Sequence, residues 1–132
     1  MKDLIAAVLV LMTMATAALA DSCWWHNGSL MRLKAYGAER YFYYEQPRDG
    51  LWSAGVRPGT LLFNGRKNGN WYSGTARVFS SACGPMEYAV AGPVAPNQTQ
   101  VTVQGSRQTR SGCAFTGNVV TDTLVFTYSH QC

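Results

Sequence analysis

The chain has 132 residues, and 11 Lys and Arg against 7 Asp and Glu give it a formal net charge of +4 at pH 7. This length is enough for one small domain. The basic residues are spread along the chain instead of forming a block, which favours ordinary solubility charge over an anionic partner such as a cell-envelope polymer. A nucleic-acid partner would fit the sign of the charge but not the exported compartment predicted below.

The first twenty residues predict a secretory signal peptide. Lys2 gives a positive start, Leu4–Met14 is apolar, and Ala18-Leu19-Ala20 fits the small-x-small rule for cleavage before Asp21. The apolar run is too short for a membrane anchor. Lipidation of Cys23 is not expected, because the residues before it are not all small and apolar. We therefore expect a periplasmic or secreted domain, residues 21–132, with no stable membrane insertion.

Short alternating runs after this point predict an all-β domain. A lead-in at residues 21–28 carries two adjacent tryptophans, and the segments Gln46–Gly59 and Ser106–Gly112 are predicted loops because they are rich in turn-forming or polar residues. The expected strands are Leu30–Ala35, Arg40–Glu45, the two arms of Thr60–Ser80, Met86–Ala91, Thr99–Gly105, Cys113–Val120 and Thr123–Tyr128. Alternation places Met31, Leu33, Ala35, Val101, Val103, Leu124, Phe126 and Tyr128 inside.

The stretch Thr60–Ser80 is the strongest hairpin signal. Asn68-Gly69 is typical of a two-residue type I′ turn, which needs positive φ at both central positions. That turn would set Phe63 opposite Gly74, so that the large ring covers the small residue. The expected inner face is Leu61, Phe63, Tyr72, Gly74, Ala76 and Val78, and the expected outer face is Asn64, Arg66, Trp71, Ser73, Thr75 and Arg77.

Seven or eight short strands predict an antiparallel up-and-down meander, closed as a small barrel or folded as a sandwich. The four cysteines all follow the predicted signal peptide, so we expect two disulfides formed in an oxidising compartment. With eight alternating strands all four cysteines would lie at one end of the barrel. Closure would then favour Cys23–Cys132, which joins the termini, and Cys83–Cys113, which joins two loops.

Both histidines lie close to the terminal cysteines. The spacings Cys23-x-x-His26 and His130-x-Cys132 leave a Cys2His2 zinc site as an alternative to a disulfide. The oxidising compartment favours the disulfide, because a disulfide leaves no thiolate to ligate the metal. We therefore expect no metal and no cofactor.

Aromatic residues are dense in the first half of the mature chain. The segment Arg40–Glu45 is aromatic on both faces, so some of its rings must point outward. Outward rings beside arginine form a surface on which a sugar ring or a peptide can stack, although the same rings could instead serve the core. The residues expected to form this binding face are Tyr41, Tyr43, Arg66, Trp71 and Arg77, with Arg66 directly opposite Trp71.

The sequence predicts a non-enzymatic domain that binds a cell-envelope component or a partner protein. No nucleophile elbow, metalloprotease helix or phosphate-binding loop is present, so no catalytic residue is assigned. A small envelope-acting hydrolase stays open as an alternative, because Glu45 and Asp49 could meet across a turn. The oligomeric state is not predicted.

The stretches CWWHNGS, RYFYYEQPR, GVRPGTLLFNGRKNGN, YSGTARVFSSAC and DTLVFTYSHQC resemble small secreted proteins of alphaproteobacteria. The resemblance covers nearly all of the mature chain. It implies an exported single domain with disulfides, and it brings no activity or catalytic residues with it. The segment Tyr72-Ser73-Gly74 and the chain length are also similar to periplasmic inhibitors of c-type lysozyme, which would imply an inhibitor-like barrel. The positive charge argues against that alternative, because such an inhibitor must meet a cationic enzyme.

Overall fold

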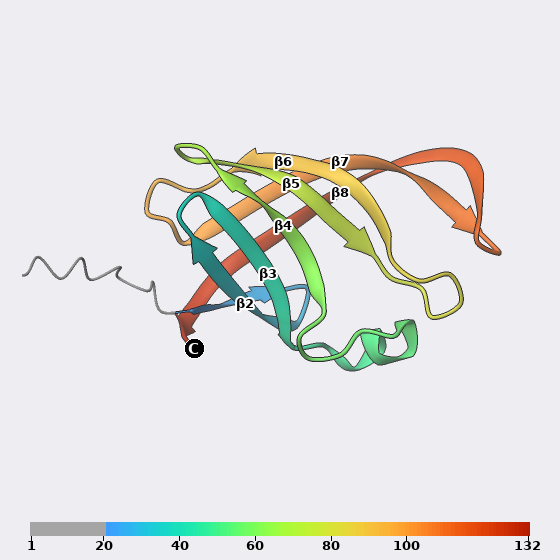
Figure 1. The fold of residues 1–132 in the computed structure, drawn as a ribbon, viewed down its shortest axis with the longest axis horizontal. Helices are drawn as coiled ribbons and strands as arrows, with labels where there is room; N and C mark the ends of the chain where they lie inside the picture. The colour runs from blue at the N-terminus through green and yellow to red at the C-terminus, as the bar shows by residue number, and fades with distance from the viewer. Residues whose placement is uncertain (1–20) are drawn as a thin grey trace, which may run out of the picture.

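The computed structural model describes residues 21–132, so the predicted signal peptide lies outside the described residues. The strands are β1 (Ser22–His26), β2 (Ser29–Tyr36), β3 (Glu39–Gln46), β4 (Leu61–Lys67), β5 (Trp71–Val78), β6 (Met86–Pro93), β7 (Gln100–Ser111) and β8 (Ala114–Gln131). Each strand pairs antiparallel with the next, and β1 pairs with β8 to close a barrel (Figure 1). The predicted antiparallel meander is confirmed, in its closed form.

The predicted strands differ from the observed strands in three places. The tryptophan-rich lead-in is β1, which pairs with both β2 and β8. A register shift after Cys23 buries both Cys23 and Trp24, and this bulge hides the alternation that marks a strand. The expected loop Ser106–Gly112 instead continues β7, and the two last predicted strands are one strand, β8. Eight strands result because one was missed and one was counted twice.

Another difference lies within the predicted loop Gln46–Gly59. It contains a short 3-10 helix, η1 (Asp49–Ala54), which ends at Gly55 with a left-handed φ of 89°. No helix in the described part of the chain is long and apolar enough to cross a membrane.

Aromatic side chains fill the middle of the barrel. Phe42 stacks on Phe126 with ring centroids 4.0 Å apart, and Trp24 meets Phe42 edge-on at 5.8 Å. The inward positions predicted for Met31, Leu33, Val101, Val103, Leu124 and Phe126 are confirmed, since all six are buried. Tyr128 is partly buried and packs against this core. The interior is therefore a packed core between two barrel ends, and it is not a continuous channel.

The hairpin of β4 and β5 has a register two residues away from the predicted one. Lys67 faces Tyr72, so four residues form the turn, and Asn68 N–H donates to the carbonyl of Trp71 at 2.9 Å. Gly69 has a positive φ of 59° but Asn68 does not, which explains why the type I′ turn does not form. A shift of two residues preserves the faces, and Phe63, Tyr72 and Ala76 are buried as predicted.

The partner of the Phe63 ring is Gly65, and the predicted partner Gly74 is wrong. Gly65 and Gly74 lie directly opposite each other. A Cβ added to Gly65 would come 2.7 Å from Phe63 Cζ, and one added to Gly74 would come 2.2 Å from the carbonyl oxygen of Asn64. Because both residues are glycine, the backbones of β4 and β5 can approach closely at this pair. The register also shifts between β3 and β4. Beside this shift Leu62 is buried, whereas Leu61, which was predicted to face inward, is only partly buried.

The two predicted disulfides form, but they lie at opposite ends of the barrel. Cys23–Cys132 closes the end at which the described chain enters β1 and leaves β8. Cys83–Cys113 joins the β5–β6 loop to the β7–β8 turn, and alternating strand directions put both at the other end. Figure 1 places the C-terminus and the β7–β8 turn far apart. The expectation of a single cysteine end is wrong because it rested on the miscounted strands. Two structural disulfides indicate an oxidising environment.

The ends of β7 and β8 extend past the rest of the barrel as a two-stranded arm, residues 106–121 (Figure 1). Residues 111–120 of the arm are exposed, including Phe115 and Val119. Solvent reaches both faces of the ribbon here. Its sequence therefore lacks the one-sided alternation from which strands are predicted.

Candidate functional site

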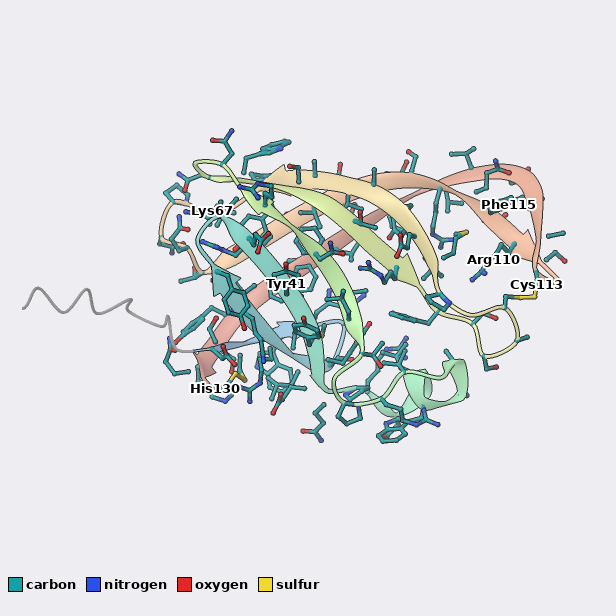
Figure 2. All side chains as sticks on the ribbon, viewed as in Figure 1. Tyr41, Lys67, Arg110, Cys113, Phe115 and His130 are labelled. Atoms are coloured by element: carbon teal, nitrogen blue, oxygen red, sulfur yellow. A yellow bond between two sulfur atoms is a disulfide. The ribbon has the colours of Figure 1, made fainter. Side chains whose placement is uncertain are left out.

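The outer face of β2 and β3 carries a cluster of tyrosines. Tyr41 and Tyr43 alternate with the buried Phe42 and Tyr44, so both rings point outward from β3. Figure 2 labels Tyr41 on this strand. The rings of Tyr41 and Tyr43 stack at 6.2 Å, and Tyr36 meets Tyr41 edge-on at 6.0 Å. Lys34 Nζ lies 5.8 Å from the centre of the Tyr43 ring. We call Lys34, Tyr36, Tyr41, Tyr43 and Arg66 the tyrosine face.

Acidic groups at the margins of this face are already engaged. Both carboxylate oxygens of Glu45 accept from Arg32, at 2.8 and 3.0 Å, and this hydrogen bonding lowers the pKa of Glu45. Arg32 also pairs with Asp21 at 3.1 Å. Tyr41 donates to Glu39 at 3.3 Å, and the charge of Glu39 is the main cause of the raised pKa of Tyr41.

These contacts do not suit the hydrolase alternative. A general acid needs a carboxyl group whose pKa is raised, whereas that of Glu45 is lowered. Asp49 lies in the first turn of η1, and within residues 21–132 it shares no hydrogen bond with Glu45. At these two positions the structure shows one carboxylate bound by Arg32 and one carboxylate in the first turn of η1.

The three other residues expected on the binding face lie at three different places. Arg66 is exposed and lies opposite Glu39 and Ser73, so it belongs to the tyrosine face. Trp71 is exposed at the start of β5 but pairs with Pro93, so the direct opposition of Arg66 and Trp71 is wrong. The two-residue register shift is the reason. Arg77 is mostly buried at the barrel end that carries the β7–β8 arm.

The barrel end with the chain termini is hollowed into a small cup. Its volume is about 400 Å³, and its walls are mainly apolar. Trp24, Leu33, Tyr72 and Val94 form its buried lining, while Arg40 and Lys67 add two cations. Figure 2 shows Lys67 at the opposite end of the molecule from Cys113. We call this hollow the terminal cup.

The opposite end holds a polar hollow of about 450 Å³, which we call the arginine basin. Its charged residues are Arg48, Arg77, Arg107 and Asp122. Arg107 Nε donates to Asp122 at 2.5 Å, and its guanidinium lies 5.9 Å from the Tyr88 ring centre. Arg77 Nη2 donates to Glu87 at 3.1 Å, whereas its Nη1 is buried with no hydrogen-bond partner in the described part of the chain.

Burial controls the titration of two basin residues. His26 stacks on Phe126 at 4.5 Å and faces the carbonyl of Val125 at 2.9 Å, which requires a proton on Nδ1 because a carbonyl only accepts. Burial lowers the pKa of His26 despite this hydrogen bond. Burial also raises the pKa of Tyr44 to about 12. Both groups are therefore neutral near pH 7.

The zinc alternative does not fit the termini. Cys23 and Cys132 are joined in a disulfide and present no thiolate. His26 is buried beside Val125, whereas His130 is exposed and faces the Ser129 hydroxyl at 2.8 Å. Within residues 21–132 no group of three or more His, Cys, Asp or Glu side chains is placed to hold a metal ion.

Sequence reasoning found part of the tyrosine face and missed both hollows. Lys34 and Tyr36 follow from the alternation of β2 once that strand is extended by one residue. The cup and basin each gather side chains from most of the strands, so only the closed barrel brings them together. No family model, curated protein or solved structure matches the chain.

Proposed function

We propose that the protein is a non-enzymatic binding domain of the periplasm or the extracellular space. Its ligand is a glycan of the cell envelope, held on the tyrosine face. The observation that carries this proposal is the row of three outward tyrosine rings in mutual contact, with Lys34 and Arg66 beside them. The two disulfides support the compartment.

The chemistry of the face favours a polar ring over an apolar partner. Tyrosine offers a flat apolar ring and a hydroxyl on one side chain, which suits a sugar ring with its own hydroxyl groups. The neighbouring strand then adds a hydrogen-bonding group, because the exposed Arg66 lies opposite Glu39. A surface for an apolar partner would instead carry a larger continuous patch of aliphatic side chains.

Co-sedimentation of the mature protein with purified peptidoglycan sacculi tests this proposal. Replacing both Tyr41 and Tyr43 with Ala should weaken retention about thirtyfold, since each lost aromatic contact is worth roughly 1 kcal/mol. Arg66→Ala should weaken it less. Trp25→Ala is the matched control, because Trp25 is an exposed aromatic residue on β1 outside the tyrosine face.

Two outcomes would overturn the proposal. One is the absence of retention by the wild-type protein. The other is equal retention of the Tyr41/Tyr43 double variant and the Trp25 variant. Thermal unfolding of each variant, followed by circular dichroism, shows whether the barrel is intact. If the protein binds untreated sacculi but does not bind sacculi from which the attached proteins have been removed, the partner is a protein and not a glycan.

A further inference from the structure

We propose that the terminal cup binds a single-chain amphiphile with one anionic group. The apolar body of this ligand occupies the cup, and its anion meets the cations of Arg40 and Lys67. This site is separate from the tyrosine face, which lies on the outer side of β2–β4. The shape, the charge and the rigidity of the cup support this assignment.

The shape of the cup suits a small apolar body. Its volume of about 400 Å³ lies within the range of small-molecule sites. Trp24, Tyr72 and Tyr128 supply aromatic walls, and the packed core closes the cup from below because Trp24 rests edge-on against Phe42. A ligand therefore enters only from the barrel mouth, and its depth of insertion is limited.

The charge of the cup is one-sided. Arg40 and Lys67 line it, and none of its 11 lining residues is acidic. Within the described part of the chain the Lys67 side chain makes no hydrogen bond or ion pair with protein. The Lys67 ammonium group lies beside an apolar hollow and has no carboxylate partner among the cup residues. The anionic headgroup of a ligand would supply that partner.

The rim of the cup is held rigid by bonds between its turns. Arg40 Nη1 donates to the carbonyls of Gly37 and Glu39, at 2.7 and 2.8 Å, which fixes the guanidinium in place. Lys67 N–H donates to Ala38 at 2.7 Å, so the β2–β3 and β4–β5 turns are joined. Gln98, whose φ of 61° is unusual for a residue with a side chain, donates to Asn70 at 2.8 Å.

These bonds link three separate turns around one opening. A preformed opening loses little conformational entropy when a ligand binds, which favours affinity for small ligands. The Gln98 amide bonds across the mouth to Asn70 of the β4–β5 turn, and it also donates to the carbonyl of Ala95 in its own loop at 3.3 Å. The hydrogen bonds between strands and the Cys23–Cys132 disulfide already close the barrel. The additional bonds around the mouth are therefore not needed for closure.

The test uses octanoate and 1-octanol, which share a chain and differ in charge. Amide chemical shifts of the isotope-labelled mature protein, disulfides intact, report both the affinity and the position of each ligand. We expect octanoate to shift the amides of Tyr72, Val94 and Gln98, and to bind about tenfold more tightly than 1-octanol, because a charged hydrogen bond is added.

Three variants separate the contributions. Lys67→Met should weaken octanoate about tenfold and leave 1-octanol unchanged, because it removes the charge and keeps the length of the side chain. Ala35→Leu narrows the cup and should weaken both ligands. Arg48→Met is the control, because it removes an exposed cation at the other end of the barrel. The spectrum of each free variant shows whether it is folded.

The proposal is overturned if octanoate and 1-octanol bind equally, if Lys67→Met has no effect on octanoate, or if the shifts lie at the arginine basin. Sedimentation with phosphatidylglycerol vesicles distinguishes the two sources of an anionic amphiphile. Binding of free octanoate without binding of vesicles supports a ligand taken from solution. Binding of vesicles without octanoate would show that the mouth contacts a lipid surface, and would also overturn the proposal.

Discussion

The two ends of the barrel treat positive charge in different ways. At the arginine basin, Arg107 pairs with Asp122 and Arg77 pairs with Glu87. At the terminal cup, Arg40 donates to the backbone carbonyls of Gly37 and Glu39, and the cup has no acidic lining. The two hollows are similar in volume, so the comparison depends on chemistry and not on size.

This difference separates cations that hold the fold from cations that are left for a ligand. Arg107 lies over Tyr88 of β6 and bonds to Asp122 of β8, so it fastens the base of the arm to the barrel. Arg110 donates to Gly84 at 3.1 Å beside the Cys83–Cys113 disulfide, which fastens the arm a second time. The basin is therefore mainly a joint between arm and barrel, and the cup is an opening.

The largest effects should come from the disulfide at each end. The 109-residue separation of Cys23 and Cys132 implies a loss of about 5 kcal/mol on its removal, against about 4 kcal/mol for the 30-residue separation of Cys83 and Cys113. Urea unfolding of the two double Cys→Ser variants measures both. A larger loss at the arm end would show that the arm fastening, and not closure of the barrel, dominates stability.

Arg107→Met should reduce the free energy of unfolding by about 1–2 kcal/mol. The substitution leaves the Asp122 carboxylate without its charged donor, and Asp122 is only partly exposed. Hydrogen exchange of amides 106–111 and 114–121 should rise more than exchange in β2 and β3, because the base of the arm loosens. Glu87→Gln is the control, since Glu87 is largely exposed and its pair with Arg77 contributes little.

The pH dependence of stability should reveal the basin histidine. Burial lowers the pKa of His26 in the folded state, so below its ordinary value of 6.5 the unfolded chain binds the proton more readily. Stability is therefore complete above pH 6.5 and declines as the pH falls toward the folded pKa. Urea midpoints between pH 7.5 and 5.5 should show this decline, and His26→Asn should flatten it. A decline that persists in His26→Asn but disappears in His130→Asn would contradict the assignment.

The sequence was sufficient for those features that depend on local alternation. Met31 and Leu33 on β2, and Leu124 and Phe126 on β8, are buried as their period-2 pattern requires. Prediction from the sequence failed where the burial of a residue depends on strands that are distant in the chain. The bulge at Cys23 and Trp24 is imposed by pairing with β8, and the arm has no buried face to produce alternation.

The binding face shows the same limit. Tyr41 and Tyr43 were placed correctly by alternation within one strand. Arg77 also lines the arginine basin, where it pairs with Glu87, its direct neighbour on β6. The cup residues Trp24, Tyr72 and Val94 come from strands or turns far apart in the chain, and only the closed sheet gathers them.

The smallest expected effect is the sharpest check on the comparison of the two ends. Lys67→Met should change the free energy of unfolding by no more than about 0.5 kcal/mol, because the ammonium has no acidic partner among the cup residues and methionine keeps the aliphatic stem. Urea unfolding of Lys67→Met and Arg107→Met under one condition gives the direct contrast. If Lys67→Met costs as much stability as Arg107→Met, the lysine holds the fold after all. The distinction between a structural end and an open end would then fail, and with it the reason for placing an anion at the terminal cup.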